Sequence, residues 1–120
     1  MLFRVFCCSL LLLSVGCKKV EVDPDAQWNT FVSRYAESYC DLREDCDPSQ
    51  FSDEFSGDEE VCKRAVVTNE NKGKSKKVED GCEFDADQGS LCLDAAQQIG
   101  CQDWVDGQLE EVCDLVWTCN

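Results

Sequence analysis

The chain has 120 residues and a formal net charge of −14, because 25 Asp and Glu outnumber 11 Lys and Arg. A nucleic-acid binder needs a basic face to meet the phosphates, so this charge argues against nucleic acid as a partner. The chain contains no histidine, which excludes the commonest general base, Ser-His and Cys-His nucleophile pairs, and histidine metal sites. We predict no catalytic residue, no metal site and no cofactor.

Residues 1–16 have the three parts of an export signal: a basic start that includes Arg4, an apolar run over residues 5–15, and small residues at the end. The apolar run is about half of the roughly 20 residues that a membrane-spanning helix needs. We therefore predict a signal peptide over residues 1–16 that is cleaved.

The end of this leader, SVGC at residues 14–17, resembles the lipobox of bacterial lipoproteins. In those proteins a lipid is joined to the cysteine and the peptide is cut just before it, which implies a lipid anchor at Cys17. Ser14 departs from the pattern, because Leu is usual at that position. The alternative is ordinary secretory cleavage after Gly16.

Cysteine parity favours the lipid anchor. Of the 11 cysteines, two leave with the leader and one is Cys17, so eight remain and can close four disulfides with no free thiol. This cysteine density is typical of small disulfide scaffolds outside the cytoplasm. The cysteines predicted to form disulfides are Cys40, Cys46, Cys62, Cys82, Cys92, Cys101, Cys113 and Cys119.

We expect a short tether over residues 17–23 and a single cysteine-rich domain over residues 24–120. The tether reaches only about 20 Å when fully stretched, so a lipid on Cys17 would hold the domain next to the membrane. In the Gram-negative lipoproteins that the leader resembles, Asp after the lipidated cysteine favours the inner membrane. Lys18 at this position favours the outer membrane.

The first helix is predicted to begin with Asp23 as its N-cap and Pro24 in its first turn. Aromatic and aliphatic residues then recur at steps of three and four, and the helix is expected to end before Pro48. We interpret the aromatic stripe as core packing rather than a ligand site. Residues 47–57 are predicted to form a loop whose two phenylalanines pack on the core.

A second, shorter helix is predicted to begin at the acidic residues 58–60 and to bury Ala65 and Val66. Residues 69–77, NENKGKSKK, contain no apolar side chain, so we predict a mobile surface loop there. Contact of this basic segment with anionic lipid or cell-wall polymer is the functional alternative to a solvated loop.

A third helix is predicted to begin at Asp85, with Gln88 completing a capping box, to bury Leu91, and to end at Gly100. The D-x-D-x-G pattern at its start lacks the Gly and Glu of a calcium loop, so helix capping is favoured. A fourth helix is predicted near Asp106. Since strand-like alternation nowhere exceeds a few residues, we predict an all-α bundle of about four helices stapled by disulfides.

The cysteine spacing predicts which kinds of bridge are feasible. Cysteines six residues apart in a helix are separated by about 9 Å along the axis and point in different directions, so bridges should join different elements. Eight cysteines allow about a hundred complete pairings. We expect one pairing, Cys46 with Cys62, across the first long loop.

The run CEFDADQGSLCLDAAQQIGC at residues 82–101, followed by a tryptophan-bearing link and EVCDLV, resembles small cysteine-rich lipoproteins of myxobacteria and related Deltaproteobacteria. The resemblance extends to the leader and to Cys40, Cys46 and Cys62. It implies an envelope location and a helical, disulfide-rich fold, and it implies no activity.

We therefore predict a non-enzymatic interaction or structural module at the cell envelope, attached to membrane lipid through Cys17, with an unknown protein or envelope component as its partner. The alternative is a secreted, soluble, disulfide-rich effector or inhibitor released by ordinary cleavage. Adjacent acidic pairs, such as Glu110 and Glu111, do not suggest glycoside hydrolysis, because neighbouring side chains on a helix diverge.

Overall fold

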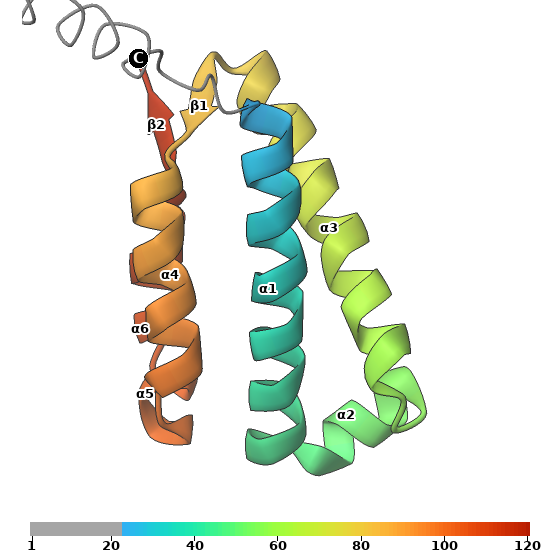
Figure 1. Ribbon diagram of the computed structural model, residues 1–120. Coiled ribbons are helices and arrows are strands. Elements are labelled where there is room, and N and C mark those ends of the chain that lie inside the picture. Colours follow the sequence, from blue (N-terminus) through green and yellow to red (C-terminus); the bar gives the residue numbers. More distant parts are fainter. Residues whose placement is uncertain (1–22) are drawn as a thin grey trace, which may run out of the picture.

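The computed structural model describes residues 23–120, and its helical, disulfide-stapled architecture confirms the predicted fold class (Figure 1). The predicted signal peptide (1–16), the predicted lipid site Cys17 and the tether up to residue 22 lie outside the described residues. The elements are α1 (Pro24–Cys46), α2 (Pro48–Phe55), α3 (Glu59–Glu79), β1 (Cys82–Phe84), α4 (Ala86–Gln98), α5 (Cys101–Val105), α6 (Gln108–Cys113), the 3-10 helix η1 (Asp114–Val116) and β2 (Trp117–Cys119).

The long helix α1 is the central element, with α3 on one side and α4, α5 and α6 on the other (Figure 1). It begins as predicted, because a side-chain oxygen of Asp23 accepts a hydrogen bond from the backbone N–H of Asp25 at 3.0 Å. Its buried residues face both sides of the molecule, so α2, α3, α4 and α5 all pack on α1, and α6 packs mainly on α4.

The segment predicted as a loop at residues 47–57 contains the short helix α2, so that prediction is wrong. The Asp47 side chain accepts from the backbone N–H of Gln50 at 3.3 Å, and proline occupies the first helical position. Proline therefore starts a helix here, because its missing N–H is not needed in the first turn. Phe51 and Phe55 are buried, as predicted.

The predicted loop at residues 69–77 is also wrong, because α3 runs through it without a break. Lys76 and Lys77 lie in the last turn of α3, where positive charge is stabilised by the negative end of the helix dipole. Polar contacts to α1 stabilise the second half of α3. The indole N–H of Trp28 donates to Asn71 Oδ1 at 2.8 Å, and Lys74 Nζ lies 2.9 Å from Asp25 Oδ1. Ala65, which was predicted to be buried, is exposed.

Helix α4 begins at the predicted N-cap, since Asp85 Oδ1 accepts from the backbone N–H groups of the second and third helical residues. Three details differ. Leu91 is 54% exposed, and Gly100 is an extended residue that precedes α5 and does not cap α4. The fourth helix predicted near Asp106 is α6, which begins at Gln108 directly after Gly107 with its positive φ of 86°, but the connection before it contains the short helix α5.

Two short antiparallel strands, β1 and β2, close one end of the molecule. Cys82 lies opposite Cys119, and Phe84 opposite Trp117. Each strand has only three residues. The alternation of apolar and polar residues that indicates a strand cannot be recognised over so short a segment of sequence. The pairing of β1 with β2 connects the last residues of the chain to the segment that directly precedes α4.

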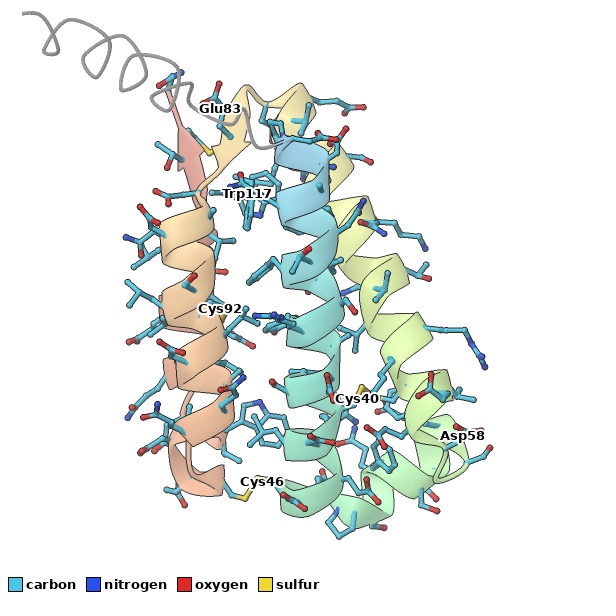
Figure 2. The ribbon with its side chains drawn as sticks, viewed as in Figure 1. Cys40, Cys46, Asp58, Glu83, Cys92 and Trp117 are labelled. Atoms are coloured by element: carbon cyan, nitrogen blue, oxygen red, sulfur yellow. A yellow bond between two sulfur atoms is a disulfide. The ribbon has the colours of Figure 1, made fainter. Side chains whose placement is uncertain are left out.

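All eight cysteines of the predicted set are bonded, and each bridge joins two different elements (Figure 2). The expected pairing of Cys46 with Cys62 is wrong. Six residues of helix rotate a side chain by about 240°, so Cys40 faces α3 whereas Cys46 faces α5. The bridges are Cys40–Cys62, Cys46–Cys101, Cys82–Cys119 and Cys92–Cys113.

The core consists of three clusters of buried residues, each with a contribution from α1. One fills the space between α1, α2 and α3: Ala36, Cys40, Phe51, Phe55, Cys62 and Val66. Another joins α1 to α4 and η1: Trp28, Phe31, Val32, Cys92 and Val116. The last joins α1 to α4 and α6: Leu42, Ala96 and Leu109.

Candidate functional site

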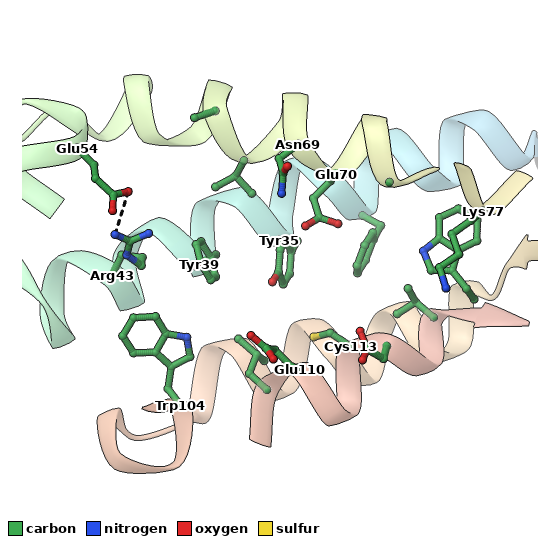
Figure 3. A pocket seen from close by; sticks show the side chains of 18 of the residues that line it. Tyr35, Tyr39, Arg43, Glu54, Asn69, Glu70, Lys77, Trp104, Glu110 and Cys113 are labelled. Carbon is green, nitrogen blue, oxygen red and sulfur yellow. Dashed lines mark ion pairs between the residues drawn. The ribbon is translucent and has the colours of Figure 1, made fainter. Parts of the chain in front are cut away.

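A groove of about 620 Å³ lies between α3 on one side and α5, α6 and η1 on the other, with α1 as its floor (Figure 3). This volume is within the range of about 300–1,000 Å³ that is typical of ligand sites. Both walls pack on α1, and the Cys40–Cys62 and Cys46–Cys101 bridges tie α1 to α3 and to α5. The groove is therefore built on covalently linked elements.

The floor of the groove is a row of aromatic rings at four-residue steps along α1, which places them on one helix face. Ring centroids are 5.8 Å apart for Phe31 and Tyr35, and 5.7 Å apart for Tyr35 and Tyr39, with interplanar angles of 20° and 25°. Trp104 meets Tyr39 edge-on at 6.3 Å. Phe31 is core, as predicted, but the two tyrosines are half-buried and line the groove.

Arg43 lies at one end of this aromatic floor and is only 9% exposed. Its Nη2 is 3.1 Å from Glu54 Oε2, and its guanidinium carbon lies 5.5 Å from the ring centre of Phe55 and 6.0 Å from that of Tyr39. Within residues 23–120, the buried Nε and Nη2 atoms have no aligned hydrogen-bond partner. Because these two nitrogens are buried, a shift of the Arg43 side chain is needed before they can donate to an acceptor in the groove.

Acidic side chains from three elements occupy the middle of the groove: Glu70 on α3, Glu110 on α6 and Asp114 on η1. Glu70 and Glu110 come from opposite walls (Figure 3). Burial, and then the negative charge of Asp114, raise the pKa of Glu70 above its ordinary value. Burial also raises the pKa of the Tyr35 phenol, and nearby negative charges, beginning with Glu70, raise it further. The middle of the groove therefore carries negative charge, of which the half-buried Glu70 is partly shielded from water while Glu110 and Asp114 are exposed.

Two of the four lysines of residues 69–77 lie against other parts of the fold. Lys74 is paired with Asp25, and its ammonium lies 5.8 Å from the ring centre of Trp28. Lys77 lines the end of the groove opposite Arg43 (Figure 3). These lysines belong to a helix and do not form a flexible loop.

No motif in the amino-acid sequence marks the residues that line the groove as a site. Of the cysteines predicted to be bonded, Cys113 reaches the groove as part of its bridge to Cys92. Glu110 lines the groove, while the adjacent Glu111 does not, as expected for neighbouring helical residues. Within the described part of the chain, no three Cys, Asp or Glu side chains are arranged to hold a metal ion.

Four disulfides indicate that the domain folds in an oxidising compartment outside the cytoplasm. None of the helices within residues 23–120 has the length and apolar character needed to span a membrane. Comparison of the chain with protein-family models, curated proteins and solved structures finds no match.

Proposed function

We propose that this protein is a non-catalytic binding module, held at the cell envelope by a lipid on Cys17, that takes up a ligand in the groove between α3 and α6. The observation that carries the proposal is the groove itself. Its aromatic floor, buried arginine and central carboxylates form a concave site of ligand size on disulfide-linked helices. Linked elements reduce the ordering cost of binding.

The chemistry of the groove supports binding rather than catalysis. The sulfur atom that reaches the groove belongs to the Cys92–Cys113 bridge and is not a nucleophile. The chain has no histidine to act as a general base. The remaining groups are aromatic rings and charged side chains, which orient and hold a ligand.

The leader supports the envelope location. Its lipobox-like end, the cysteine parity and the likeness to small cysteine-rich lipoproteins all favour a lipid on Cys17, and Lys18 favours the outer membrane. The six residues from Lys18 to Asp23 would keep the start of α1 within about 20 Å of the lipid surface. The groove would then meet molecules at the envelope.

The anchor is tested by expressing the full chain in a Gram-negative host, separating membrane from soluble fractions, and measuring the mass of the mature amino terminus. We expect the protein in the outer-membrane fraction with an acylated Cys17, and a Cys17→Ser variant in the soluble fraction. An unmodified amino terminus in the soluble fraction would show instead a secreted effector produced by ordinary cleavage after Gly16.

The groove is tested separately by NMR, with a panel of small amphiphilic compounds added to the oxidised domain. We expect the chemical-shift changes to concentrate at Tyr35, Tyr39 and Trp104, because these rings form the floor and one end of the groove. Changes spread evenly over the surface would contradict the assignment of this groove as the binding site.

A further inference from the structure

Charge is distributed unevenly along the groove. Carboxylates gather at its middle around Tyr35, while the end near Trp104 carries Arg43. The charge of Arg43 is already balanced by Glu54. The carboxylates at the middle have no such partner, because the ion pairs within residues 23–120 do not include Glu70, Glu110 or Asp114.

A cationic group is the natural occupant of the middle of the groove. Glu70 and Asp114 both line the groove, and burial, and then the negative charge of Asp114, disfavour the ionised form of Glu70 and raise its pKa. The face of the Tyr35 ring adds a surface that attracts an ammonium group. A ligand ammonium placed there would relieve the repulsion between the carboxylates.

The end near Arg43 suits a different part of the same ligand. Arg43 lines this end, and its Nε–H has no aligned acceptor and becomes available to a ligand when the side chain shifts. Glu54 beside it disfavours an anion, so a neutral carbonyl oxygen fits better than a carboxylate. Tyr35 and Arg43 are eight residues apart on α1, or about 12 Å. An extended peptide covers this distance with about four residues.

We propose that the groove binds the amino-terminal end of an extended peptide, with its ammonium between Glu70 and Asp114 and a backbone carbonyl at Arg43. The intervening backbone lies along the ring of Tyr39. This inference rests on the proposal that the groove is the binding site. A linear polyamine fits less well, because its second ammonium would meet Arg43, and a neutral sugar would leave the carboxylates uncompensated.

The test is an NMR titration of the oxidised, full mature chain with tetraalanine amide in about 150 mM salt, which screens general attraction to the acidic surface. We expect the free amine to bind at the groove and the acetylated peptide to bind about tenfold more weakly or not at all, since a charge-assisted contact is lost. Dialanine amide keeps the ammonium but cannot reach Arg43, and it should also bind more weakly.

Matched variants localise the effect. Glu70→Gln and Asp114→Asn should each weaken the free-amine peptide several-fold or more, while Glu111→Gln, which removes a charge outside the groove, should leave binding unchanged. Equal binding of the free and acetylated peptides would overturn the proposal, and so would tighter binding of spermidine or of a neutral tetrasaccharide. If none of these ligands binds but amphiphilic compounds still occupy the groove, the ligand class is wrong and the binding site stands.

Discussion

Two glycines within helices have opposite surroundings. A Cβ atom on Gly89 of α4 would lie 2.9 Å from Phe84 Cζ and 3.2 Å from Phe31 Cδ2. Gly89 is buried, so no side chain fits there without moving the aromatic cluster around Trp28. A Cβ atom on Gly73 of α3 would meet nothing within 4 Å.

We predict that Gly89→Ala destabilises the fold by about 1–3 kcal/mol, because crowding of the two phenylalanines outweighs the gain in helix propensity. Gly73→Ala, its matched control, should stabilise by about 0.5–1 kcal/mol, since alanine restricts the unfolded chain and nothing opposes its side chain. Denaturant unfolding of the oxidised proteins gives both values. Equal effects of the two substitutions would show that Gly89 is not tightly packed.

A second prediction concerns Glu70, whose pKa is raised by burial and by Asp114. A carboxyl with a raised pKa in the folded state keeps its proton to higher pH than in the unfolded state, so its ionisation costs stability as the pH rises through the folded pKa. Glu70→Gln should therefore be more stable than the natural chain at neutral pH. The difference should vanish below the ordinary value of 4.5.

Thermal unfolding of the two proteins across this pH range measures the difference. Glu79→Gln, an exposed change at the end of the same helix, is the control. A Glu70→Gln variant that is less stable at neutral pH would contradict the raised pKa. The sign also matters for the groove, because a bound cation would offset the burial and the repulsion from Asp114 that disfavour ionised Glu70 in the free protein.

At the scale of elements, α3 shows how polar contacts extend a helix beyond its apolar stripe. Its inward-facing positions continue at four-residue steps, but Cys62 and Val66 give way to Glu70 and Lys74, which are half-buried. The indole N–H of Trp28, a residue that is 1% exposed, depends on Asn71 for its acceptor. This contact joins the second half of α3 to the start of α1.

We predict that Asn71→Ala destabilises the protein by about 1–2 kcal/mol, because it leaves a buried indole donor without a partner. Lys72→Ala, an exposed neighbouring change in the same helix, should have little effect. Hydrogen exchange provides a second measurement: amides of residues 70–78 should be protected in the natural chain and exchange faster in Asn71→Ala. Fast exchange in the natural chain would restore the predicted loop.

At the scale of the whole molecule, the two ends of the bundle are closed in different ways. The Cys46–Cys101 bridge joins α1 to α5 at one end. The β1–β2 ribbon and the rings packed on Trp28, at centroid distances of 5.1–5.5 Å, close the other end. Removing the bridge should therefore open the groove at the end that holds Arg43 and Trp104.

The double variant Cys46→Ala/Cys101→Ala should lose about 4 kcal/mol of stability, because the bridge spans 55 residues and restricts the unfolded chain accordingly. Because Cys101 is exposed, replacing it with alanine removes little packing from the core. We also expect Trp104 fluorescence to shift toward that of a solvated indole, measured in a variant in which the other two tryptophans are phenylalanine. Unchanged stability and fluorescence would show that packing alone closes this end.

The sequence alone predicted features that depend on local chemistry. Helix starts at Asp23 and Asp85 followed from capping side chains, which act within three residues of the chain. The burial of Phe51 and Phe55 followed from their size and hydrophobicity. The full use of eight cysteines followed from parity, and the need for bridges between elements followed from helix geometry.

Tertiary structure decided everything that depends on which faces meet. Disulfide pairing was set by the directions in which Cys40 and Cys46 leave α1, and the length of α3 was set by polar contacts that leave no apolar periodicity. The groove exists because two walls pack on opposite sides of α1 without closing over its tyrosines, which brings together Glu70 and Asp114 from distant parts of the chain. Composition and spacing report what each residue prefers, whereas a site depends on distances that only the packed helices establish.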